Sequence, residues 1–159
     1  MEKTRFIDGG VTAPAGFRAA GIHAGIKGAR PDLALLVSDP VAGVAGVFTS
    51  NRIQAAPVRL CRQRLANRRA AAVVVNSGCA NACTGEDGLT DAAGMGSLTA
   101  EALGVEEESV FVCSTGTIGT RLPLKIIADA LPELVGALDA AGGGAAARAI
   151  MTTDTRPKE

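Results

Sequence analysis

The sequence has few aromatic residues and no excess of charge. Aromatic side chains make up 3% of it, all four of them Phe, and 16 Lys and Arg residues balance 16 Asp and Glu residues. Proteins that bind nucleic acid depend on positive surfaces and on aromatic rings that stack against bases. The composition therefore argues against nucleic acid as a partner.

Long apolar runs are also absent. Residues 1–8 are polar where a signal peptide would carry its apolar stretch. A membrane-spanning helix needs about 18 or more consecutive apolar residues, and the sequence contains no such run. We therefore expect no membrane partner and a cytoplasmic location.

Side chains that bind metals are scarce as well. His23 is the only histidine, and Cys79 and Cys83 lack a second Cys or His pair at ligand spacing. We expect no metal site, and we expect His23 to be a packing or turn residue. Cys61 and Cys113, like the other two cysteines, lie in segments expected to be core strands or small-residue loops. Without an export signal, all four should be reduced thiols.

What the sequence does contain is apolar residues sufficient for one packed core. Hydrophobic residues make up 47% of the 159 positions, and no linker rich in Pro, Gly and Ser divides them. We therefore predict a single α/β domain over residues 1–159.

Four apolar runs are typical of β-strands. Residues 33–38 and 44–50 flank Asp39-Pro40, a turn signal, and are predicted to pair as neighbouring strands. Residues 71–76 and 109–114 are rich in β-branched side chains and apolar on both faces, so we predict that they are central strands.

Residues 89–103 carry apolar side chains at helical spacing and are followed by Gly104, a residue typical of a helix C-terminus. Gly94 and Gly96 lie inside this predicted helix, where each glycine costs about 1 kcal/mol relative to Ala. We expect close packing against the sheet to compensate for this cost.

A second helix is predicted to begin at Pro123 and to continue to Leu138, with a kink or a break at Pro132. Residues 145–151 are predicted to form a short helical turn.

Two loops are candidates for a binding or catalytic site. Residues 76–85 follow a buried strand and precede a helix, where N–H groups favour an anion, but a loop chosen for tight packing explains them equally well. Residues 113–119 can direct a hydroxyl and a backbone amide at one point, as stabilisation of an oxyanion requires. Such a turn is more often structural.

Three further polar groups have ordinary explanations. Asp154 either caps its neighbours or holds a substrate, and both interpretations stay open. Residues 106–108, three glutamates, are expected to form a soluble loop. Five arginines are expected to form a solvated helix face rather than a phosphate site; they are Arg59, Arg62, Arg64, Arg68 and Arg69.

Five short segments, taken in order, are far more specific than any of them alone. They read GVTAPAGF (10–17), GVFTSN (46–51), VNSGCANA (75–82), STGTIG (114–119) and MTTDTRPK (151–158). In this order they resemble the bifunctional ornithine acetyltransferase / glutamate N-acetyltransferase family of arginine biosynthesis, with 46–51 matching its second strand. Cys79 stands where many members carry Asn.

The resemblance implies a layered α/β sandwich of the self-processing N-terminal-Thr acetyltransferase type. In that family a precursor cleaves itself, and the new N-terminal Thr of the second chain carries acetyl from N-acetylornithine to glutamate. By resemblance, Thr115 and Gly116 would form the oxyanion hole and Thr152 would contact substrate. No cofactor is implied, although acetyl-CoA is a candidate co-substrate. The implied partner is a β chain in an α2β2 heterotetramer.

The family's self-cleavage motif belongs downstream of Thr155, and residues 1–159 do not include it. We therefore expect an N-terminal portion of the α chain that lacks the nucleophile, is inactive alone and exposes surfaces that its partner covers. Two alternatives stay open. One is a non-catalytic binding or assembly module, and the other is an amidohydrolase of the same self-processing fold.

Overall fold

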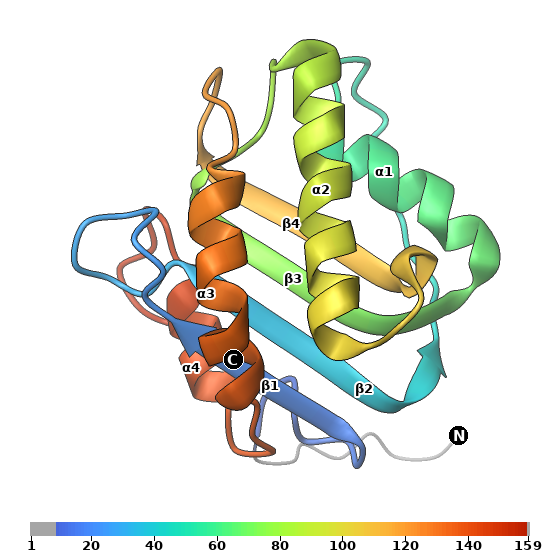
Figure 1. The fold of residues 1–159 in the computed structure, drawn as a ribbon, viewed down its shortest axis with the longest axis vertical. Helices are drawn as coiled ribbons and strands as arrows, with labels where there is room; N and C mark the ends of the chain where they lie inside the picture. The colour runs from blue at the N-terminus through green and yellow to red at the C-terminus, as the bar shows by residue number, and fades with distance from the viewer. Residues whose placement is uncertain (1–8, 159) are drawn as a thin grey trace, which may run out of the picture.

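The computed structural model describes residues 9–158, so the polar stretch of residues 1–8 and Glu159 lie outside the described residues. Four strands form one sheet in the order β1-β2-β3-β4. They are β1 (Phe17–Ile22), β2 (Leu33–Gly43), β3 (Arg69–Cys79) and β4 (Val110–Thr117). The first three strands are antiparallel neighbours, and β4 runs parallel to β3 (Figure 1).

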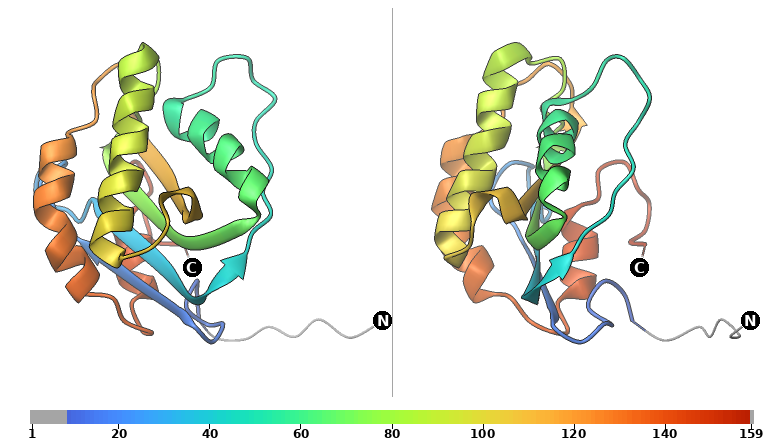
Figure 2. Two further views of the ribbon diagram at one scale, coloured as in Figure 1. Left: turned by 45° about the vertical axis from the view of Figure 1, so that its right-hand side comes forward. Right: turned by 90° about the vertical axis from the view of Figure 1, so that its right-hand side faces the viewer.

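Helices cover both faces of this sheet. Three of them pack on one face: α1 (Ala56–Arg64), α2 (Gly85–Leu103) and α3 (Leu124–Gly136). The short helix α4 (Gly143–Ala149) packs on the other face, as the right-hand view of Figure 2 shows. The predicted layered α/β class is confirmed.

The two faces differ in the size of their side chains. Leu35 of β2 and Val74 of β3 pack under the three helices with Met95, Ile127 and other large apolar residues. On the opposite face, the buried cluster consists of four alanines: Ala19 and Ala34 of the sheet pack against Ala146 and Ala149 of α4. These small side chains let α4 lie close to the sheet. The neighbours Ala34 and Leu35 belong to different faces because successive residues of a strand point to opposite faces.

Helix α2 confirms the predicted helix and its C-terminal cap. Gly104 has φ +66°, the left-handed conformation that commonly ends a helix. The expected packing of Gly94 and Gly96 against the sheet is wrong, because both glycines face other helices. A Cβ on Gly94 would lie 3.0 Å from Cδ1 of Leu124 in α3, and one on Gly96 would meet the guanidinium of Arg64 in α1.

The predicted strand over residues 44–50 is wrong, as is its pairing through Asp39-Pro40. Strand β2 continues past Pro40 to Gly43, with a shift in its register to β3 between Val37 and Ala42. Pro40 therefore lies at an irregularity of a strand, where a missing N–H is tolerated, rather than in a hairpin turn. Residues 44–50 form neither a strand nor a helix, and Val47 is 98% exposed.

The prediction of two central strands is confirmed for β3 and wrong for β4. Strand β3 lies between β2 and β4, whereas β4 has only β3 beside it within residues 9–158. A continuous apolar run in the sequence indicates that both faces of a strand are covered. It does not report whether both edges are hydrogen-bonded.

The predicted break at Pro132 is also absent, since α3 is continuous from Leu124 to Gly136. Pro132 is exposed while its neighbour Leu131 is buried. The proline therefore lies on the solvent side of α3, and burial of Leu131 and Leu134 holds the helix together. The predicted helical turn over residues 145–151 corresponds to α4.

Helix α1 corrects two expectations. Cys61 lies in a helix and not in a strand or loop, and Arg64 is 6% exposed rather than solvated. Arg64 donates hydrogen bonds to the Val110 carbonyl and to Glu107, 2.6 Å away, so Glu107 is an ion-pair partner and not merely a soluble loop residue. The other four arginines are exposed, as predicted, but the expected helix face is wrong for Arg68 and Arg69, because α1 ends at Arg64 and Arg69 begins β3.

Among residues 9–158, no helix has the length and apolar character needed to cross a membrane.

Candidate functional site

The carboxyl ends of β3 and β4 bring the predicted oxyanion residues beside a second pair of small residues. Thr115 is the register partner of Ser77, and Gly116 is the partner of Gly78. Thr115 is half-buried and Gly116 is exposed, so both reach the surface. The structure thus puts the predicted pair at an accessible strand end.

Gly116 permits an unusually close approach of the two strands. Its φ is +133°, and a Cβ added there would lie 2.3 Å from the carbonyl carbon of Gly78 and 2.6 Å from its oxygen. A side chain at this position would therefore push β4 away from β3. This position near the end of β4 needs glycine both for its conformation and for its packing.

Ser77 shows which face of the sheet this site occupies. Its hydroxyl donates a hydrogen bond of 2.5 Å to the carbonyl of Ala149, the last residue of α4. Register partners on neighbouring strands point to the same face, so Thr115 lies on the α4 side of the sheet.

Thr152, the predicted substrate residue, follows α4 on the same side of the sheet. It is half-buried. The carbonyl of the preceding residue, Met151, accepts a hydrogen bond of 2.6 Å from Nζ of Lys27. Ser77 therefore contacts the segment leading to Thr152 and is also the strand neighbour of Thr115.

Asp154 is engaged by its own neighbours. Its carboxylate accepts hydrogen bonds from the Lys158 ammonium at 2.5 Å and from the Thr152 N–H at 3.5 Å. These contacts, that of Lys158 foremost, lower the pKa of the Asp154 carboxyl below its usual range. The structure therefore supports the capping interpretation of Asp154.

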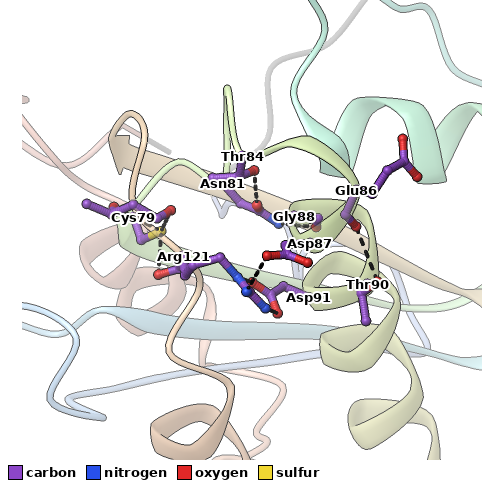
Figure 3. Close-up of polar contacts among 10 residues, drawn as sticks. Cys79, Asn81, Thr84, Glu86, Asp87, Gly88, Thr90, Asp91 and Arg121 are labelled. Atoms are coloured by element: carbon purple, nitrogen blue, oxygen red, sulfur yellow. Dashed lines mark hydrogen bonds and ion pairs between the residues drawn. The ribbon is translucent and has the colours of Figure 1, made fainter.

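Asn81, in the loop over residues 76–85, uses its side-chain amide to bond the start of α2. Asn81 donates a hydrogen bond of 2.8 Å to the Gly88 carbonyl and accepts one of 2.7 Å from the Thr84 hydroxyl, at the start of α2 (Figure 3). Glu86 and Asp87 place negative charge in the same first turn. An anion there would meet like charge, so the tight-packing interpretation fits better.

Arg121, in the connection between β4 and α3, forms ion pairs with the first turns of α2. Its guanidinium bonds both carboxylate oxygens of Asp91, at 2.6 and 2.7 Å, and a carboxylate oxygen of Asp87 at 2.8 Å (Figure 3). The thiol of Cys79 lies 3.4 Å from the Thr120 carbonyl oxygen. Cys79 thus packs against the connection that follows β4.

His23 is a turn residue, as expected. Its Nδ1 lies 3.0 Å from the Arg30 carbonyl oxygen and 3.3 Å from Oδ2 of Asp32. Cys61, Cys79, Cys83 and Cys113 are free thiols. Within residues 9–158, no group of three or more His, Cys, Asp or Glu side chains is arranged to hold a metal ion.

Sequence reasoning missed Lys27 and gave no individual role to Ser77. Ser77 lies in a segment that the motif analysis had selected, so position alone could have suggested it. Lys27 contacts a residue 124 positions away in the chain. No local pattern marks such a contact.

Comparisons with known proteins agree with one another. A family model described as the ArgJ family matches residues 18–159. The Arginine biosynthesis bifunctional protein ArgJ of Thermosynechococcus vestitus is 55% identical over 100% of this chain and 38% of its own length. The protein of the same name from Caldanaerobacter subterraneus is 49% identical over 94% of this chain and 37% of its own length.

Two solved structures have the same fold. The Arginine biosynthesis bifunctional protein argJ of Bacillus halodurans superimposes with a TM-score of 0.89 at 42% identity, over 93% of this chain and 78% of that one. Ornithine acetyltransferase from Mycobacterium tuberculosis, in complex with ornithine, gives a TM-score of 0.90 at 46% identity, over 93% and 81%. The chain spans less than two fifths of the length of the curated relatives named above.

Proposed function

The chain belongs to the ArgJ family, and on that premise we propose that it forms the oxyanion side of an arginine-biosynthesis acetyltransferase. The family match and the relatives confirm the resemblance carried by the five sequence segments. The observation that supports the proposal most directly is the approach of Gly116 to Gly78, which needs glycine at the accessible end of β4.

The proposed reaction is acyl transfer in two steps. The hydroxyl of an N-terminal Thr on a second chain attacks the acetyl carbonyl of N-acetylornithine, and ornithine leaves as its amine takes up a proton. The amine of glutamate then attacks the resulting acetyl ester and releases the Thr hydroxyl. Covalent catalysis divides one difficult transfer into two easier steps.

Each step passes through a tetrahedral intermediate with negative charge on the former carbonyl oxygen. The hydroxyl of Thr115 and the N–H of Gly116 are proposed to donate hydrogen bonds to that oxygen. Donors that are already oriented stabilise the charge without reorganising as it develops. Thr152 is proposed to contact substrate from the segment after α4.

The finer details of the reaction extend the same proposal. No cofactor is required, because the acetyl group moves between an amide, an ester and an amine without redox chemistry. Acetyl-CoA is a candidate second donor of the acetyl group. Its thioester would react with the same Thr nucleophile.

The proposed partner is a β chain that bears the Thr nucleophile, in an α2β2 heterotetramer located in the cytoplasm. The α4 face of the sheet supports such a partner, because Leu36 and Val75 are only half-buried there. An apolar cavity of about 160 Å³, lined in part by Val11 and Val73, opens beside them. We expect residues 1–159 alone to be inactive.

The test is to produce this chain together with the remaining length of its relatives and to measure acetyl transfer from N-acetylornithine to glutamate. We expect Thr115→Ala to lower kcat by about 10²–10³-fold, the usual effect of losing one oxyanion donor. Thr117→Ala is the matched control, because Thr117 is exposed two residues further along β4. It should retain activity.

Three results would contradict the proposal. Full activity in Thr115→Ala would exclude its role as a donor. Release of acetate in place of N-acetylglutamate would favour the amidohydrolase. Tight binding of a small molecule by residues 1–159, with no acetyl transfer after the second segment is added, would favour a binding module.

A further inference from the structure

The loop between β1 and β2 is built around a buried carboxylate. Asp32 is fully buried, and its side chain accepts hydrogen bonds from the N–H groups of Ala24, Gly25 and Lys27 at 2.7, 3.2 and 2.8 Å. Its own carbonyl accepts the Ser77 N–H at 2.8 Å. A buried carboxylate with several N–H donors fixes the backbone around it, so this loop has one defined path next to β3.

This path carries the Lys27 side chain across the end of β3. A Cβ on Gly78 would lie 2.9 Å from Cγ of Lys27 and 2.9 Å from Cγ2 of Ile26, so the Lys27 stem passes directly over the Gly78 backbone. Gly78 has φ +118°. Because Gly78 has no side chain, the Lys27 side chain can cross the end of β3 and reach Met151.

At its far end, Lys27 contacts the segment that leads to Thr152. Nζ donates to the Met151 carbonyl at 2.6 Å, and the Ser77 hydroxyl donates to the Ala149 carbonyl at 2.5 Å. These are main-chain carbonyls at and just after the C-terminus of α4, where a cation is favoured. Two side chains thus hold one short segment by its backbone.

The lysine sits in a partly dehydrated position. Burial lowers the pKa of the Lys27 ammonium, repulsion from Arg30 acts in the same direction, and attraction to Asp32 opposes both. The hydrogen bond from Nζ to the Met151 carbonyl is itself partly buried, so water replaces it less readily than it would at an open surface. Removing the ammonium should release the segment locally.

We propose that Lys27 is a positioning residue that, together with Ser77, holds Thr152 in register with Thr115 and Gly116. Ser77 is the strand partner of Thr115, and the Lys27 stem passes over Gly78, the strand partner of Gly116. Both anchors of the Thr152 segment therefore lie next to the proposed oxyanion donors. This inference rests on the proposed function, because it assigns Lys27 a part in the same site. Lys27 acts through Thr152 and not on the reacting atoms.

The experiment compares Lys27→Met, Lys27→Arg and Lys125→Met in the assembled enzyme, that is, this chain produced with the remaining length of its relatives. Lys125 lies on α3, where its side chain is 87% exposed. We expect Lys27→Met to raise the KM for substrate about tenfold while kcat changes less than about twofold, since a binding residue is displaced and the oxyanion donors are not. Lys27→Arg should restore most of the KM, and Lys125→Met should behave as wild type.

Hydrogen exchange supplies a readout that does not depend on activity. In Lys27→Met, amides of residues 150–155 should exchange faster, while those of β3 and β4 keep their wild-type rates. An unchanged KM would overturn the proposal, and so would exchange that accelerates uniformly over the whole chain. Absence of acetyl transfer in the wild type contradicts the proposed function instead, and the exchange measurement then still decides whether Lys27 holds the segment.

Discussion

At the scale of single residues, Gly116 combines two requirements that are separable elsewhere in the chain. Its backbone adopts a positive φ, and its α-carbon lies against the main chain of Gly78. Gly119 also has a positive φ, +83°, but an added Cβ would have open space around it. Substitutions at Gly116 and Gly119 therefore separate the free-energy cost of backbone strain from that of a clash between strands.

We predict that Gly116→Ala lowers the free energy of unfolding by about 2–4 kcal/mol, since strain in the left-handed region adds to overpacking. Gly119→Ala should cost about 1–2 kcal/mol, from strain alone. Urea denaturation followed by circular dichroism measures both values. Equal losses in the two variants would contradict the close approach of β4 to β3.

The oxyanion pair and Lys27 mark how far single residues were predictable. Residue types indicated only the segment 113–119 as a candidate, and the family resemblance then singled out Thr115 and Gly116, whose role stays a prediction. The ammonium of Lys27 meets a carbonyl 124 residues later. That contact depends on the path of the loop around Asp32 and on the position of α4, neither of which local residue types determine.

At the scale of secondary-structure elements, the contact between α1 and α2 depends on a buried arginine and a facing glycine. The guanidinium of Arg64 passes over Gly96, where a Cβ would lie 2.3 Å from Nη1, and reaches the Val110 carbonyl at the start of β4. One side chain therefore joins two helices and a strand.

We predict that Arg64→Met lowers the free energy of unfolding by about 2–4 kcal/mol, because it leaves the buried Val110 carbonyl without its donor. Arg59→Met is the control, since Arg59 is exposed on the same helix. It should change stability by less than about 0.5 kcal/mol. Thermal unfolding of both variants tests this, and losses of similar size would show that the Arg64 contacts contribute little.

Local patterns predicted the elements unequally, for physical reasons. Helix α2 carries its own signals, a helical period of apolar residues and a terminal Gly104, and both concern neighbours in the chain. Residues 44–50 are as apolar as a strand, but a strand also needs a hydrogen-bonding neighbour, and β2 takes the place beside β3. Pro132 does not break α3 as predicted, because Pro132 is exposed and the buried Leu131 and Leu134 hold the helix together.

At the scale of the whole molecule, the sheet is unevenly covered. Three helices close one face, whereas α4 alone packs on the other (Figure 2). Leu36 and Val75 on that face are only half-buried. The same face carries Ser77 and, by register, Thr115. The proposed partner chain would therefore meet apolar surface and the site on a single side.

We predict that Val75→Asp weakens association with the proposed β chain at least tenfold, because a charge on this face would be buried without a partner. Ala102→Asp, at an exposed position of α2 on the opposite side, is the control and should assemble normally. Co-purification and analytical ultracentrifugation of the co-expressed chains measure the effect. If Val75→Asp assembles as the wild type does, the partner binds elsewhere.

The loop between β1 and β2, residues 23–32, limits where residues can be inserted or deleted in this chain. Each residue of an extended chain spans about 3.3–3.6 Å, so a single insertion between Ala24 and Lys27 would displace the N–H groups that bond to Asp32 and shift the Lys27 stem relative to Gly78. Residues 44–50, which run over the surface, meet no such constraint. Insertions and deletions should therefore accumulate after β2 and be rare before it, although both segments are irregular.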